Sequence, residues 1–309
     1  MKRRTFISRA LLTMAGLLFF KDNSEAKAAP DVAKFSEVNL AAWSKDTLNI
    51  CWIGHSTILI NFYGKYILTD PVMYRSIGIS FLGTTLGPSR YSAPAIAIED
   101  LPKIDLVLLS HGHMDHTDYP TLKYLTEKFA KQIDCITAYN TADISDDLAW
   151  KSIKELDWDE ETVWEGIRVR AFKTQHFGWR FPWEKDRSKG FFKDGRSFNA
   201  YLLDCKGKKI VFGGDTALTD SYLNEKLDID VAIMPIGAYN PWKTKHCSPE
   251  EAVKMAGDMK AKVFIPIHCE TFKLGMEPMD EPLIRLKNTL NNSKMSLGIS
   301  SIGDIYTLA

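Results

Sequence analysis

The residues best suited to chemistry are three histidines and one aspartate within six positions, His111-x-His113-x-Asp115-His116. Neutral imidazoles and carboxylates are the ligands that hold borderline divalent metals such as zinc. Their crowding is unfavourable unless a cation neutralises and orients them. A polar turn with surface histidines is the alternative, but so many ligand types rarely share one short window. The spacing therefore predicts a metal site.

The elements that must position this cluster are visible as apolar patterns. The run 104–109 directly precedes it and is typical of a buried strand, which would place the ligands at a strand end. We expect further strands over 48–53, 58–62, 66–69, 133–139, 199–204, 208–212, 230–235 and 262–267, and a second sheet that includes 153–156, 162–164 and 167–174. Helical spacing predicts helices over 120–131, 249–259 and 283–290.

Other landmarks accompany the cluster along residues 48–285. They are Trp52-Ile53-Gly54-His55-Ser56-Thr57, Leu68-Thr69-Asp70-Pro71, Gln175-His176, Gly213-Gly214-Asp215-Thr216, Pro235-Ile236-Gly237-Ala238-Tyr239, His246 with Pro249-Glu250-Glu251-Ala252, and Ile267-His268-Cys269-Glu270-Thr271-Phe272. Together they resemble the metallo-β-lactamase superfamily, and are most similar to its branch containing N-acylphosphatidylethanolamine-hydrolysing phospholipase D. A more distant resemblance is to the ascorbate-6-phosphate lactonase type. The resemblance implies an α/β fold of four layers, the αββα sandwich, with its site at one edge between two sheets.

The resemblance also implies a complete set of ligands for two metal ions. It assigns His111, His113 and His176 to one ion, and Asp115, His116 and His268 to the other, with Asp215 shared. Two zinc ions are expected, and iron and manganese accept the same ligands. A water between the ions would lose a proton near neutral pH, and this metal-bridged hydroxide would be the nucleophile.

Five more residues receive roles around this centre. The resemblance places Asp70 behind the metal loop, where it would orient ligands, and His55 near the site without making it a ligand. For His55 a purely structural hydrogen bond is equally consistent with the sequence. His246 and Asp115 are the candidate catalytic groups, and His246 would face the substrate and handle a proton, unless it merely packs at a helix start. Tyr239 and Trp179 are candidate substrate contacts.

Two long segments are candidates for the walls of a substrate cleft. Residues 72–98 are rich in Gly, Ser and Pro but keep apolar residues, which argues against disorder. Residues 177–198, the aromatic segment, interleave aromatic rings with charges, which suits an apolar substrate or lipid head groups. Packing against the body of the protein is the alternative for both.

Length and composition fit one enzyme domain, which we expect over 29–309. The chain has 309 residues, of which 45% are hydrophobic, enough for one large core. Basic and acidic residues balance at 39 each, which gives no reason to expect nucleic acid as a partner. Five cysteines without a Cys-x-x-Cys pair do not indicate a disulfide framework, and neither Cys247 nor Cys269 receives a role.

The first 28 residues resemble an export signal of the twin-arginine type. Adjacent arginines, Arg3 and Arg4, precede an apolar run over 10–20 that is short for a bilayer span. The small residues Ala26 and Ala28 predict cleavage before Ala29, and hence a periplasmic or otherwise exported protein. An uncleaved membrane anchor is the alternative.

These observations lead to one leading function and two alternatives. The leading expectation is an exported phosphodiesterase of the phospholipase D type, acting on a phospholipid or another phosphodiester and in contact with a membrane surface. The first alternative is a hydrolase of lactones, other esters or cyclic phosphates that uses the same metals. The second is a non-catalytic module that binds metal or lipid, which the complete ligand set disfavours.

Overall fold

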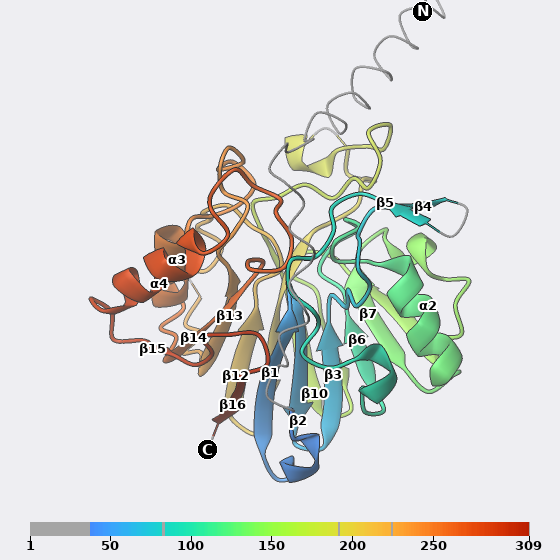
Figure 1. Cartoon of the computed structure of the whole chain (residues 1–309), viewed down its shortest axis with the longest axis horizontal. Coiled ribbons are helices and arrows are strands. Elements are labelled where there is room, and N and C mark those ends of the chain that lie inside the picture. Colours follow the sequence, from blue (N-terminus) through green and yellow to red (C-terminus); the bar gives the residue numbers. More distant parts are fainter. Residues whose placement is uncertain (1–37, 82–83, 191, 224, 309) are drawn as a thin grey trace, which may run out of the picture. The chain divides into compact units, whose positions relative to one another are not determined.

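The computed structural model describes residues 38–308 except 82–83, 191 and 224. The predicted export signal, residues 1–28, therefore lies outside the described residues. The described chain forms two seven-stranded sheets, a two-stranded sheet and three α-helices (Figure 1). Among these residues, no helix has both the length and the apolar character needed to cross a bilayer.

The first sheet combines an antiparallel meander with a parallel half. Its strands lie in the order β16 (Ile305–Leu308), β1 (Leu48–Gly54), β2 (Thr57–Phe62), β3 (Lys65–Thr69), β6 (Leu106–Leu108), β7 (Asp134–Ala138) and β8 (Ser152–Leu156). The predicted meander is confirmed as β1 to β3, and the strands from β3 to β8 run parallel. The carboxyl ends of these parallel strands consequently meet at one edge.

The second sheet repeats this plan. Its strands lie in the order β15 (Ser296–Leu297), β14 (Val263–Ile267), β13 (Val231–Pro235), β12 (Lys208–Phe212), β11 (Asn199–Cys205), β10 (Ile167–Lys173) and β9 (Glu161–Trp164). Here β9 to β12 pair antiparallel and β12 to β15 pair in parallel. The placement of 153–156 in this sheet was wrong, because that strand, β8, pairs with β7 of the first sheet. Its alternating exposure is typical of any edge strand and does not specify a sheet.

The remaining elements are short. The helices are α2 (Tyr119–Lys128), α3 (Pro249–Asp258) and α4 (Glu281–Leu290), and four 3₁₀ turns are η1 (Leu40–Ala42), η2 (Ile98–Asp100), η3 (Ala142–Ile144) and η4 (Arg187–Lys189). A hairpin of β4 (Ile79–Phe81) and β5 (Thr84–Leu86) interrupts the segment 72–98. The predicted capping box at the start of α3 is present, with Ser248 accepting from the Glu251 amide and Glu251 accepting from the Ser248 amide.

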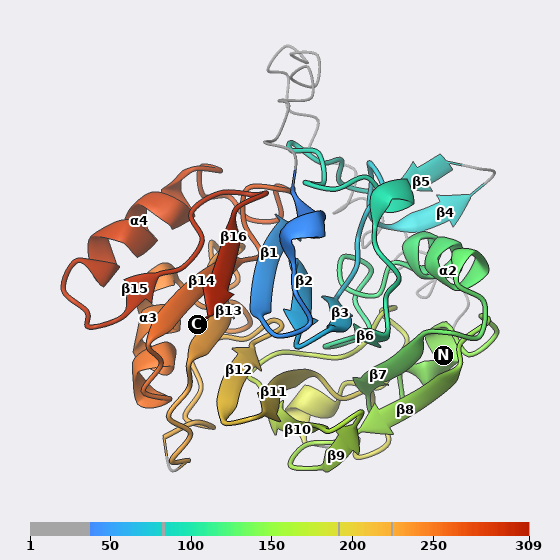
Figure 2. The ribbon, with the colours of Figure 1, turned by 90° about the horizontal axis from the view of Figure 1, so that it is seen from below.

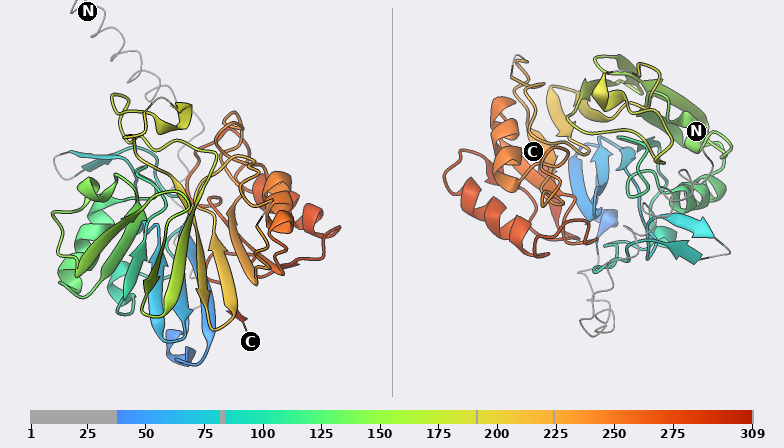
Figure 3. Two further views of the ribbon diagram at one scale, coloured as in Figure 1. Left: turned by 180° about the vertical axis from the view of Figure 1, so that it is seen from behind. Right: turned by 90° about the horizontal axis from the view of Figure 1, so that it is seen from above.

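The layers are those of an αββα sandwich, which confirms the expected fold. Large side chains of both sheets, including Trp52 and Phe212, are fully buried in a common core. Leu122 and Leu125 of α2 pack in a separate cluster on the first sheet, whereas α3 and α4 cover the second sheet (Figures 2 and 3). Both outer layers leave the edge with the strand ends open to loops, and these loops carry the predicted ligands.

Candidate metal centre

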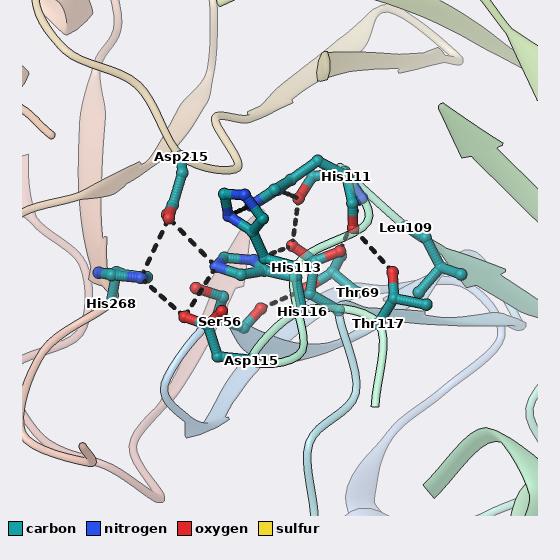
Figure 4. Close-up of polar contacts among 12 residues, drawn as sticks. Ser56, Thr69, Leu109, His111, His113, Asp115, His116, Thr117, Asp215 and His268 are labelled. Atoms are coloured by element: carbon teal, nitrogen blue, oxygen red, sulfur yellow. Dashed lines mark hydrogen bonds and ion pairs between the residues drawn. The ribbon is translucent and has the colours of Figure 1, made fainter. Parts of the chain in front are cut away.

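The predicted ligands follow the ends of strands from both sheets. The metal loop, residues 110–117, follows β6, and Asp70 follows β3. His176 follows β10, Asp215 follows β12, and His268 comes directly after β14. Figure 4 shows that histidines of the metal loop, Asp215 and His268 point toward one another. Residues more than 150 positions apart in the sequence are thus brought to one place.

Three imidazole nitrogens form the first group of candidate ligands. Nε2 of His111 lies 2.8 Å from Nδ1 of His113, and Nε2 of His176 lies 3.2 Å from that same atom. His176 donates from Nδ1 to the carbonyl oxygen of Lys245 at 2.9 Å, so its neutral ring presents a lone pair at Nε2. Burial lowers the pKa of His111 and His176 well below the ordinary value, which keeps both rings neutral. Neutral rings with converging lone pairs fit a metal cation.

Asp115, His116 and His268 form the second group. Oδ2 of Asp115 lies 3.5 Å from Nε2 of His116 and 3.4 Å from Nε2 of His268. Within the described part of the chain, these two buried nitrogens have no hydrogen-bond partner, although a carboxylate lies at ion-pair distance. Buried polar atoms without partners are rare in proteins. A cation between them and the carboxylate would satisfy all three groups.

Asp215 lies between the two groups. Its Oδ2 atom is 3.1 Å from Nε2 of His268, 3.2 Å from Nε2 of His116 and 3.8 Å from Nε2 of His176. Burial opposes ionisation, but the neighbouring histidines, above all His116, hold the pKa of Asp215 well below its ordinary value. An ionised carboxylate that reaches members of both groups has the position required of a shared ligand.

The carboxylates also favour positive charge at the centre. Burial disfavours the imidazolium form of His268, yet Asp215 and Asp115 raise its pKa to about 9. Burial likewise acts against charge on His116, and Asp215, Asp115 and Asp70 raise its pKa well above the ordinary value. Three carboxylates that stabilise positive charge on imidazoles would also stabilise a divalent cation in the same place.

Asp70 contacts the metal loop from behind, where the resemblance placed it. The fully buried carboxylate accepts from the Ser110 amide at 2.7 Å, from Ser110 Oγ at 2.5 Å and from Nδ1 of His116 at 2.6 Å. Ser110 Oγ also lies 2.8 Å from Nδ1 of His111. When a bound cation takes the place of the proton on Nε2, the proton that remains on Nδ1 of His116 leaves Nε2 of the neutral ring as the lone-pair donor to that cation. Asp70 therefore selects the tautomer that a ligand needs.

His55 contacts the centre through Asp115. Its Nε2 atom lies 3.1 Å from Oδ2 of Asp115, and its ring is buried. Burial is the main reason that its pKa falls to about 3. The backbone of His55 has a positive φ of 51°, accepts from the His268 amide at its carbonyl oxygen and donates from its own amide to the Thr271 hydroxyl. The turn between β1 and β2 thus holds both Asp115 and the segment that carries His268.

The candidate substrate contacts have three different environments. His246 has its Nδ1 atom 3.6 Å from Asp215 Oδ2 and a side chain that is 13% exposed, so it is accessible beside the centre. Trp179 packs on Phe177, whose ring lies 4.3 Å from that of His113. Tyr239 is buried and donates its hydroxyl to Glu281 at 2.7 Å. Because that hydroxyl is engaged with α4, the structure offers no support for Tyr239 as a polar contact of a substrate.

Sequence reasoning missed several residues that support the centre. Ser110, directly before the cluster, received no role, and Thr271 was only part of a landmark, although each fixes a histidine-bearing segment. Arg180 was not singled out at all, because one cation in a segment rich in charges carries no distinguishing pattern. Its contacts with the metal loop join segments that are more than 60 residues apart.

Comparison with known proteins identifies the family and the fold. Residues 65–269 match the family model of the beta-lactamase superfamily domain. The chain is 31% identical over 260 residues to N-acyl-phosphatidylethanolamine-hydrolyzing phospholipase D 1 of Caenorhabditis elegans, covering 77% of this chain and 69% of that protein. It is 29% identical over 276 residues to an uncharacterized protein of Mycobacterium tuberculosis, covering 87% and 70%. The fold is similar to that of a metallo hydrolase of Ignicoccus hospitalis, with a TM-score of 0.61 at 17% identity, covering 85% and 99%.

The chain belongs to the metallo-β-lactamase superfamily of metal-dependent hydrolases, with relatives of the N-acylphosphatidylethanolamine phospholipase D type. Most of the landmarks that carried this resemblance in the sequence lie in the segments that build the centre.

Proposed function

We propose that the protein is a phosphodiesterase of the phospholipase D type, which hydrolyses a phospholipid to phosphatidic acid or a similar phosphate ester. One observation carries this proposal: two groups of ligands share Asp215, and the accessible His246 lies beside them. The similarity to the C. elegans phospholipase D supports the choice of bond. Two zinc ions held by the seven ligands would lower the pKa of water and offset negative charge on a phosphodiester.

The residues of the chain have distinct tasks in this proposal. The side chain of Asp115 is 16% exposed. Desolvation opposes its ionisation, but the histidines around it hold its pKa well below the ordinary value. The ionised carboxylate accepts a hydrogen bond from the attacking water. Burial, against the opposing charge of Asp215, lowers the pKa of His246 to about 4, so the ring is neutral at pH 7. A neutral ring donates one hydrogen bond, which would orient an oxygen of the phosphate or of the leaving group.

A substrate screen tests the proposal against the lactonase alternative. Purified protein would be assayed with bis-p-nitrophenyl phosphate, N-acyl phosphatidylethanolamine and a series of lactones, each with and without a chelator. We expect hydrolysis of the two phosphodiesters that the chelator abolishes and that added zinc restores. Activity confined to lactones would refute the phosphodiesterase assignment, and phosphodiesterase activity that resists the chelator would refute the metal-dependent mechanism.

We also propose that the protein contacts a membrane surface near the centre. Large apolar side chains are exposed in loops at the edge that carries the metal centre, with Trp183 at 78%, Trp242 at 55% and Met276 at 57%. Tryptophan is favoured where apolar chains and polar head groups meet. Co-sedimentation with phospholipid vesicles should weaken in Trp183→Ser and stay unchanged in Val163→Ser, which removes an apolar residue that is 70% exposed on β9. Equal binding of both variants would contradict this contact.

Export remains part of the proposal. A twin-arginine route carries folded proteins and would allow metals to be loaded before export, which suits a ligand set drawn from the whole fold. Mass spectrometry of protein recovered from the periplasm should give an N-terminus at Ala29, and a mature chain that starts at Met1 would contradict cleavage.

A further inference from the structure

Arg180 joins the aromatic segment to the metal loop at two points. Its Nη1 atom donates to the carbonyl oxygen of Gly112 at 2.8 Å and to that of Thr117 at 2.9 Å. These two carbonyls stand on either side of His113, Asp115 and His116. One guanidinium therefore fixes the backbone at both ends of the stretch that supplies ligands to both groups.

The environment of this guanidinium suggests a role beyond ordinary ion pairing. Among the described residues, no carboxylate lies at ion-pair distance from Arg180, and burial lowers its pKa, with Asp118 acting in the opposite direction. The side-chain hydrogen bonds of this partly buried cation go to two backbone carbonyl groups, which indicates that its role is to position the backbone.

A network of charged side chains fixes the base of Arg180. Its amide donates to Oε2 of Glu184 at 2.8 Å, and Glu184 accepts from Nε of Arg196 at 2.9 Å. Arg196 also pairs with Asp143 and donates to the carbonyl oxygen of Asn140. The turn that carries Arg180 is thus anchored to the segment after β7, so the guanidinium has a defined position.

The aromatic segment contacts the metal loop elsewhere as well. Phe198 forms a β-bridge with His111, and the ring of Phe177 packs on that of His113. Directly after the segment, the Asn199 amide at the start of β11 donates to the Ser110 carbonyl. We propose that Arg180 is a positioning residue, which fixes the two carbonyls around the ligands of the metal loop and couples the aromatic segment to metal binding. This inference concerns metal affinity and holds whatever bond the protein hydrolyses.

The test compares Arg180→Met with Arg187→Met. Arg187 lies in the same aromatic segment but pairs with Asp157 at 2.7 and 2.8 Å and stacks on Trp158, so its loss is a matched control. Zinc dissociation constants would be measured by competition with a coloured chelator, starting from metal-free protein. We expect R180M to bind zinc roughly 10- to 100-fold more weakly, the usual effect of losing a group that orients ligands. R187M should bind zinc as tightly as the wild type.

Hydrogen exchange separates positioning from a purely structural role. Zinc should slow exchange at amides 177–184 in the wild type and in R187M, but not in R180M. If R180M does not fold, Arg180→Lys serves instead, because its shorter side chain keeps the charge and cannot reach both carbonyls in the same way. Wild-type zinc affinity in the folded Arg180 variant, or an equal loss in R187M, would overturn the proposal.

Discussion

Replacement of Asp70 by asparagine should weaken metal binding without removing a single metal ligand. The carboxylate accepts three hydrogen bonds, from the Ser110 amide, Ser110 Oγ and Nδ1 of His116. Asparagine has the same shape but only one acceptor oxygen, and its NH₂ group can only donate. Ser110 Oγ can rotate and accept instead, whereas the Ser110 amide and Nδ1–H of His116 cannot. One of these two donors must therefore lose its partner.

The more damaging outcome places the NH₂ group against His116. The ring can then avoid a clash of two donors by moving its proton from Nδ1 to Nε2, which removes the lone pair that points at Asp115 and Asp215. A buried donor left without a partner costs about 1–3 kcal/mol. Loss of a group that orients a ligand lowers metal affinity roughly 10- to 100-fold, which corresponds to about 1.4–2.7 kcal/mol. The cost of an unpartnered donor and the loss of metal-binding free energy are therefore of similar size.

Chelator competition measures this loss directly, and Asp134→Asn is the matched control. Asp134 is also a buried carboxylate with several donors, from Lys151, Ser152 and Trp164, but it lies at the start of β7, away from the strand ends that carry the ligands. D134N should lose stability and keep its zinc affinity. If D70N bound zinc as tightly as the wild type, or if D134N lost as much affinity, the reasoning about the His116 tautomer would be refuted.

Three further predictions follow from the same contacts. His246→Ala should lower kcat by roughly 10²-fold or more while elemental analysis still finds two metals per chain, and loss of metal would show that His246 is a ligand. Chelation should lower the unfolding temperature in calorimetry, because free metal at 100 times its dissociation constant contributes about 2.7 kcal/mol to stability; an unchanged temperature would indicate that these residues hold no metal. Burial acts against ionisation of Asp134, but Lys151, Ser152 and Trp164 lower its pKa below the ordinary value. The stabilisation of the fold by ionised Asp134 is therefore complete above the unfolded-state pKa and is lost as the pH falls through the lower folded-state pKa. In urea unfolding, the stabilities of D134N and wild type should converge below about pH 4.

The sequence was informative wherever function depends on neighbouring residues or on a strand that ends in a ligand. The metal loop contains four candidate ligands in six positions, and the buried strands before Asp215 and His268 indicated where those residues would lie. The αββα sandwich followed from resemblance, because apolar periodicity alone does not specify which strands share a sheet. β8 shows this limit, since its pairing with β7 depends on backbone contacts that no local pattern encodes.

Side-chain partners were harder to predict than positions along the chain. Tyr239 follows a strand end, as several ligands do, yet its hydroxyl reaches Glu281, 42 residues later in the sequence. For Arg180 the sequence carried no signal at all, because nothing in the neighbouring residues predicts its two hydrogen bonds to the metal loop. In both cases the decisive contact joins segments that meet only after the sheets have packed.

The distribution of ligands between the sheets links metal binding to the fold. The first group takes His111 and His113 from the loop after β6 of the first sheet and His176 from the end of β10 in the second. The second group takes Asp115 and His116 from the first sheet and His268 from the second, and Asp215 adds a contact from β12. Each metal would thus bridge the two sheets at the edge where the strands end. At the same edge Tyr201 of β11 donates to the carbonyl oxygen of Leu109, so protein contacts alone already hold the sheets close there. Loss of metal should consequently loosen the ligand loops before it separates the sheets, because the buried core between the sheets does not depend on the ions.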